Sequence, residues 1–181
     1  VSTVLANSAS AVVKLTGTST QTITSGSSAS LAATFEVDKE FGTATVNGSV
    51  FKVGAFTNTQ GTFTNNTTTM ILTGAYAQTG GTFNGGSGAV SMSDFTLSST
   101  GVYNASTGTT TMSGNFTNTS GGTFNHNNGS IVATGGAASW NVNSTINFYN
   151  FEVVTPSNAN AFTVSSGDTI VVNGNYVQTR G

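Results

Sequence analysis

The chain has 181 residues, a formal net charge of −2 and no cysteine, and hydrophobic residues make up 36% of it. Its 4 basic and 6 acidic residues form no basic cluster, which argues against binding to nucleic-acid phosphates or to an anionic membrane surface. Without cysteine, disulfides and thiol chemistry are excluded. We expect one folded domain spanning 1–181, with no membrane insertion, because no run of eighteen apolar residues is present.

The N-terminal part, 1–53, reads as irregular coils of a repeat that becomes regular later. Val50 to Gly54 lies 20 residues before the similar stretch Met70 to Gly74, and 13–17 has the same form. This part also holds the one local acidic group, made of Glu36, Asp38 and Glu40, with Lys39 on the opposite face of a strand. The simpler interpretation of that group is a solvent-exposed edge of the stack, and the alternative is a weak cation-binding site.

The middle part, 54–134, is a repeat of roughly 20 residues. Segment 54–73 matches 74–93 without a gap, and 94–113 and 114–134 keep the pattern with one-residue adjustments. Aromatic residues recur every 19 to 21 residues in two columns, which we predict to be stacked core ladders: Phe56, Tyr76, Phe95 and Phe116 in one, and Phe63, Phe83, Tyr103 and Phe124 in the other. Apolar residues alternate with Thr, Ser or Asn, as in a strand with one buried face, and Gly- and Asn-rich stretches interrupt the runs as turns do.

These features favour an all-β fold, a parallel β-helix or β-solenoid, over antiparallel alternatives. A sandwich needs hairpins, and its strands would not repeat one sequence in parallel register. The C-terminal part, 135–181, continues as coils richer in apolar residues, with strands expected at 140–143, 146–153 and 169–176 and with Pro156 in a loop. About nine coils of roughly 20 residues, with uncapped ends, are therefore predicted.

The two ends of the sequence read as complementary halves of one coil. Segment 173–181 matches the first half of a coil, as in 73–81, and 4–17 resembles the second half, as in 62–74. Uncapped solenoid ends expose backbone groups that template further strands, so we expect copies to stack head to tail into a filament. The alternative is a segment of a longer solenoid. The side chains expected at the assembly interface are Val4, Leu5, Val13, Leu15, Val171, Tyr176 and Val177.

No catalytic, cofactor or metal-binding pattern emerges, and we expect a protein that is not an enzyme. Enzymatic β-helices carry clusters of Asp, Glu, Lys or Arg, and glycoside hydrolysis alone needs paired carboxylates. The sole histidine, His126, lies in a turn with no acid or cysteine nearby in sequence. The glycine-rich stretches lack the strand, Lys and helix context of a phosphate loop.

Acceptor sequences for N-glycosylation are abundant, although the high Asn, Ser and Thr content produces several by chance. They lie at Asn47, Asn65, Asn66, Asn104, Asn115, Asn118, Asn128 and Asn143. Threonine arrays such as Thr57, Thr59 and 67–69 leave ice binding open as a further reading, but Asn, Ala and Gly interrupt them.

The stretch Gly-Asn-Phe-Thr-Asn-Thr-Ser-Gly-Gly-Thr-Phe-Asn at 114–125, together with Phe-Tyr-Asn-Phe at 148–151, resembles repeats of large prokaryotic surface proteins of the adhesin and autotransporter-passenger kind. The resemblance implies an extracellular or cell-surface stalk, adhesin or fibre, and it carries no site residues, because the shared positions are core and turn positions. The expected function is a structural protomer of an extracellular filament that binds other copies of itself. The alternative is a segment of a surface adhesin that binds a glycan or a host surface.

Overall fold

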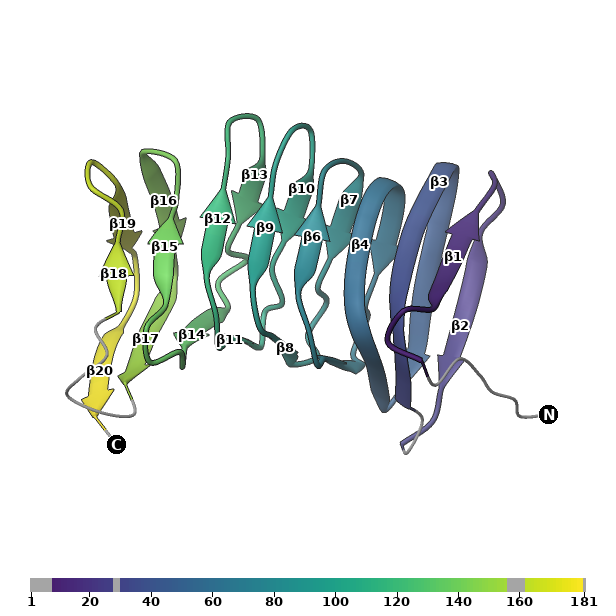
Figure 1. The fold of residues 1–181 in the computed structure, drawn as a ribbon, viewed down its shortest axis with the longest axis horizontal. Coiled ribbons are helices and arrows are strands. Elements are labelled where there is room, and N and C mark those ends of the chain that lie inside the picture. Colours follow the sequence, from purple (N-terminus) through teal and green to yellow (C-terminus); the bar gives the residue numbers. More distant parts are fainter. Residues whose placement is uncertain (1–7, 28–29, 156–161, 181) are drawn as a thin grey trace.

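The computed structural model describes residues 8–27, 30–155 and 162–180, and within these ranges the chain forms strands and no helix. The strands stack side by side into an elongated body (Figure 1). Their bounds are β1 Val12–Thr16, β2 Gln21–Ser25, β3 Ser30–Gly48, β4 Val50–Thr64, β5 Thr69–Leu72, β6 Tyr76–Gln78, β7 Thr82–Asn84, β8 Val90–Met92, β9 Phe95–Leu97, β10 Val102–Asn104, β11 Thr109–Met112, β12 Phe116–Asn118, β13 Thr123–Asn125, β14 Ser130–Ala133, β15 Ser139–Asn141, β16 Thr145–Phe148, β17 Asn150–Thr155, β18 Thr163–Val164, β19 Thr169–Val172 and β20 Tyr176–Arg180.

The strands stack in parallel on three faces, so that each coil contributes one strand to each face. Face 1 holds β5, β8, β11, β14, β17 and β20, face 2 holds β6, β9, β12, β15 and β18, and face 3 holds β7, β10 and β13 followed by β16 and β19. The long strand β4 pairs with β5, β6 and β7, so it runs along all three faces. The β-solenoid prediction is confirmed, and the stack has about 8 turns where about nine coils were predicted.

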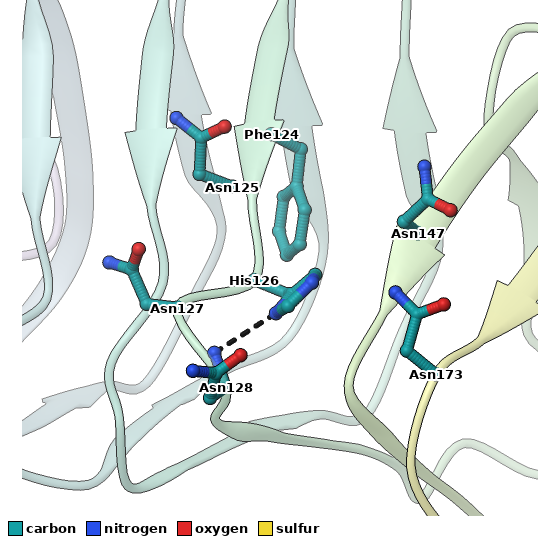
Figure 2. A pocket seen from close by; sticks show the side chains of 7 residues that line it. All are labelled: Phe124, Asn125, His126, Asn127, Asn128, Asn147 and Asn173. Atoms are coloured by element: carbon teal, nitrogen blue, oxygen red, sulfur yellow. Dashed lines mark hydrogen bonds between the residues drawn. The ribbon is translucent and has the colours of Figure 1, made fainter.

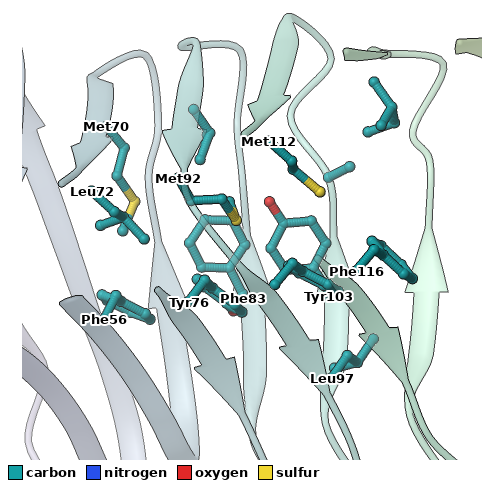
Figure 3. Close-up of a cluster of buried hydrophobic side chains, with 14 of the residues drawn as sticks. Phe56, Met70, Leu72, Tyr76, Phe83, Met92, Leu97, Tyr103, Met112 and Phe116 are labelled. Atoms are coloured by element: carbon teal, nitrogen blue, oxygen red, sulfur yellow. The ribbon is translucent and has the colours of Figure 1, made fainter. Parts of the chain in front are cut away.

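The core is a stack of aromatic rings, one coil above the next, as the two predicted columns require (Figure 3). Phe56, Tyr76 and Phe95 stack nearly parallel, with ring centroids 5.3 Å apart at each step. Phe83 and Tyr103 stack at 4.8 Å. Inward side chains alternate with outward Thr, Ser and Asn along each short strand, which is why three residues suffice for a strand here. Of the eight predicted ladder residues only Phe124 is half-buried rather than buried.

A second ladder, of asparagine amides, follows the outside of face 3. The side-chain nitrogen of Asn104 donates to the amide oxygen of Asn84 at 2.8 Å, and that of Asn125 donates to Asn104 at 2.8 Å. Equivalent amides on successive coils lie one strand spacing apart, so each can donate to the coil before it. Thr64 begins this ladder by accepting from Asn84 at 3.4 Å.

Face 3 is interrupted between β13 and β16, which the regular repeat did not predict. Strand β13 pairs with β10, whereas β16 pairs only with β19 in a separate two-stranded sheet. The connections explain the break: residues 126–129 join β13 to β14, but only Tyr149 joins β16 to β17. Because β17 continues face 1 in register with β14, this short corner draws β16 away from β13.

Candidate functional site

The first described coil places aliphatic side chains at the N-terminal end of the described stack. Val13 and Leu15 on β1 are in register with Phe35 and Val37 on β3, and both lie half-buried against the core. Their neighbour Val12 points outward and is 55% exposed. Of the predicted assembly residues at this end, Val4 and Leu5 lie outside the described residues, and Val13 and Leu15 lie on the inner side of β1.

The last described coils form an apolar recess of about 560 Å³ at the C-terminal end of the stack. Tyr176 continues the inner column of Phe151 and is 56% exposed because the described coils end with its strand. The side chains that line the recess are Phe151, Phe162, Val164, Asp168, Thr169, Ile170, Val172 and Tyr176.

Two of the predicted assembly residues at this end, Val171 and Val177, point to the outer side of their strands. Val171 is in register with Asn147, and Val177 with Glu152, both on the outer side of the coil before. Alternation along a strand therefore places Ile170, not Val171, on the inner side. The sequence pattern alone did not show which of three consecutive apolar residues in β19 turns inward.

The end coil reproduces an internal hydrogen bond of the repeat. Inside the stack the Tyr76 hydroxyl donates to the Gln78 amide oxygen at 2.7 Å, and the Gln78 nitrogen donates to the carbonyl of Val102 in the coil above at 3.1 Å. The same pair recurs as Tyr176 and Gln178 at 3.2 Å. The end coil therefore repeats the arrangement of an interior coil, in which the glutamine side-chain nitrogen donates to a backbone carbonyl of the next coil.

A lysine from the adjacent coil forms ion pairs with two carboxylates of the acidic group of β3. The Lys14 ammonium contacts Glu36 at 3.0 Å and Asp38 at 2.5 Å, so it lies where a bound cation would lie. Its hydrogen bonds to Asp38 and then Glu36 raise the pKa of Lys14, and the hydrogen bond from Lys14 is the largest cause that lowers the pKa of Asp38. Glu40 is exposed and takes no part in this cluster.

Lys39 lies on the opposite, inner face, as the strand alternation predicts, and it is fully buried there. Its ammonium donates to the Gln21 side-chain oxygen at 2.7 Å and to the Thr16 carbonyl at 3.3 Å. Within the described ranges no group of three or more His, Cys, Asp or Glu could hold a metal ion.

The predicted glycosylation acceptors differ in how exposed their side chains are. Asn47, Asn66, Asn115, Asn128 and Asn143 are exposed, and Asn104 is half-buried in the amide ladder. Asn118 is only 8% exposed and Asn65 is fully buried. An attached glycan cannot be accommodated at those two positions in the folded chain, because their side chains turn into the core.

His126 lies at the interrupted part of face 3, where the structure places it beside asparagines that the sequence does not bring together. With Asn147 and Asn173 of later coils it lines a recess of about 530 Å³ (Figure 2). The sequence signal for this recess is the spacing of the aromatic columns, which widens from 19–21 residues to 24 between Phe124 and Phe148.

Comparisons of the chain with protein-family models, with curated proteins and with solved structures give no match. Among the described residues, no helix is long and apolar enough to cross a membrane.

Proposed function

We propose that the chain is a structural module of an extracellular or cell-surface fibre, in which copies stack end to end through the open faces of the solenoid. The observation that supports this most directly is the apolar recess in the last described coils, because core side chains such as Phe151, Ile170 and Val172 line it. Among the described residues β20 pairs with β17 alone, and the other edge of a strand presents a row of backbone groups to which a further parallel strand can pair.

The two open faces are compatible in chemistry. Ile170, Val172 and Tyr176 offer apolar side chains at one end, and Val13 and Leu15 offer aliphatic side chains at the other. Joining two different faces of identical copies gives a heterologous contact, which does not close into a ring unless the rotation brings the ends together. Such a contact extends the ladder and the core in the same direction as the coils within one chain.

The proposal is tested with paired variants whose side chains are neighbours on one strand but point to opposite sides. Val172→Glu places a charge in the inner column of the end coil, and we expect it to abolish assembly, because a carboxylate would be buried without a partner. Val171→Glu places the same charge on the outer side and serves as the matched control. Sedimentation velocity and negative-stain electron microscopy report the assemblies over a wide range of concentrations.

The N-terminal face supplies the complementary test. Leu15→Glu should block assembly, whereas Val12→Glu on the outer side should not. A mixture of Leu15→Glu with Val172→Glu keeps one intact end on each variant, so head-to-tail stacking predicts a complex that stops at a dimer. A wild-type chain that stays monomeric at every concentration, or equal behaviour of the Val171 and Val172 variants, would contradict the proposal.

A further inference from the structure

The interruption of face 3 creates a recess on the side of the solenoid, between β13 and the last two described coils (Figures 1 and 2). Its volume of about 530 Å³ falls within the range of about 300–1,000 Å³ typical of small-molecule sites. No lining side chain is an acid, a lysine or an arginine. The residues that line it are Phe124, Asn125, His126, Asn127, Asn128, Asn147 and Asn173.

Backbone groups of both strands face this recess without a partner strand. The N–H of Thr123 donates to Gly101 at 2.9 Å and the carbonyl of Asn125 accepts from Ala105 at 2.9 Å, so both residues direct their backbone groups to the preceding coil. Alternation then directs those of Phe124 towards β16. On β16, the Phe148 carbonyl accepts from the N–H of Asn173 in the following coil at 2.9 Å. By the same alternation, the backbone groups of Asn147 are directed towards β13.

The turn that carries His126 is held in a defined conformation. The imidazole Nδ1 accepts from the Asn128 N–H at 2.9 Å, which in the neutral ring leaves the Nε2–H as a donor for another group. Asn127 and Asn128 have φ of 45° and 59°, a region that non-glycine residues adopt infrequently. The Asn127 amide anchors the turn by donating to the Ala105 carbonyl at 3.0 Å.

The amide ladder ends at the rim of the recess. Asn125 donates to Asn104, and its own amide oxygen accepts from no further coil among the described residues. Asn147 and Asn173 face it from the other wall, and both are exposed (Figure 2). Each asparagine offers one acceptor and two donors, so the walls present donors and acceptors in alternation without charge.

The floor of the recess is aromatic and closed. The half-buried ring of Phe124 contacts Phe148 edge to face, with centroids 5.4 Å apart, so the core is filled between the two coils. An inserted peptide strand would direct alternate side chains into that filled core, and the contact leaves no room for them. Tyr103 stacks on one face of the Phe124 ring, so a ligand in this recess must contact the part of the ring that stays exposed and bond outward to the amides.

We propose that this recess binds a neutral oligosaccharide. The apolar C–H face of a pyranose ring can pack against the exposed part of Phe124, while its hydroxyl groups, each both donor and acceptor, pair with the asparagine amides, the His126 Nε2–H and the free backbone groups. The ring of Tyr149, which stacks on His126 with centroids 5.9 Å apart and is 38% exposed, extends the aromatic surface at the lip. This binding site is independent of the end-to-end stacking proposed above.

The test is calorimetric titration of the full chain with cellotriose, mannotriose, laminaritriose and chitotriose, with sialyllactose as a charged comparison. At least one neutral trisaccharide should bind, and sialyllactose should bind no better. The variants His126→Ala and Asn147→Ala should each weaken that binding about tenfold, as the loss of one or two hydrogen bonds predicts. Asn66→Ala, an exposed asparagine in the equivalent turn of an uninterrupted coil, should change it less than about twofold.

Nuclear magnetic resonance gives a second readout that a general loss of stability would not move. The same trisaccharide should shift the side-chain amide signals of Asn147 and Asn173 and leave that of Asn66 in place. The proposal is overturned if no neutral trisaccharide binds, if the recess variants bind as wild type does, or if an extended Thr- and Asn-rich peptide displaces the sugar and pairs with the strand edges instead.

Discussion

Two buried tyrosines of the core ladder allow the same substitution to be made at one hydroxyl that is hydrogen-bonded and at one that is not. Tyr76 stacks between Phe56 and Phe95, and Tyr103 stacks between Phe83 and Phe124. Phenylalanine already occupies equivalent positions in both columns, so replacing either tyrosine by phenylalanine keeps the packing and removes only the hydroxyl. The two variants therefore measure the hydroxyl group alone.

The expected effects differ in sign because the hydroxyls differ in partners. Tyr76 donates to Gln78 at 2.7 Å inside the core, so Tyr76→Phe leaves a buried amide oxygen without a donor and should lower the free energy of unfolding by about 1–3 kcal/mol. The Tyr103 hydroxyl is buried beside the Thr110 hydroxyl and makes no hydrogen bond of good geometry. Tyr103→Phe removes a polar group that is desolvated without compensation, and should raise the free energy of unfolding by up to about 1 kcal/mol.

Urea unfolding followed by circular dichroism measures both variants against wild type under one set of conditions. Because assembly would stabilise the folded chain by mass action, each is measured in the background of Val172→Glu, which blocks the proposed stacking. Equal destabilisation by the two substitutions would refute the reasoning, since it would mean that the Tyr103 hydroxyl is as well bonded as that of Tyr76.

Three further predictions follow from the same coils. Thr110→Val should raise the free energy of unfolding by about 1 kcal/mol, because the buried Thr110 hydroxyl has no partner and its ladder neighbours are aliphatic; a thermal melt that shows destabilisation would contradict this. Gly86→Ala should lower the free energy of unfolding by about 3 kcal/mol or more, because φ at Gly86 is +62° and the added carbon would collide with backbone carbonyls of the preceding coil. Gly17→Ala, where φ is +84° and the space around the residue is open, should lower it by only about 1–2 kcal/mol. Burial raises the pKa of Tyr76 and Tyr103, so these tyrosines ionise at lower pH in the unfolded chain than in the folded one. The free energy of unfolding should therefore fall above about pH 10, by up to about 1.4 kcal/mol per pH unit for each tyrosine. Alkaline unfolding curves of the double Phe variant should lack this part of the pH dependence.

Most of the fold could be predicted from residue spacing because a solenoid is stabilised by contacts between equivalent positions. Phe56 contacts Tyr76 and Tyr76 contacts Phe95 because a parallel stack brings residues one period apart into register. The coil length, the inward columns and the outward Thr and Asn positions all follow from that rule. The same rule predicted Lys39 to lie opposite the carboxylates of β3, which the structure confirms.

The candidate sites could be predicted only in part. Hydrophobicity alone predicts Val171 and Val177 at an interface, and only the register of β19 and β20 shows that their side chains point to the outer side of the coil. A run of apolar residues does not reveal its inward phase until its partner strand is known. The lysine that neutralises Glu36 and Asp38 likewise comes from another coil, and its pairing depends on register.

The sequence by itself determined the period, the inward columns and therefore the solenoid, since these depend on a local pattern repeated many times. The sequence also marks where the period changes, by the 24 residues between Phe124 and Phe148, but only the tertiary structure decided how the strands rearrange there. The short corner at Tyr149 draws β16 away from β13, because β17 must stay in register with β14 while the connection to it shortens. That displacement, which no single coil encodes, brings His126 and asparagines of three different coils together in one recess.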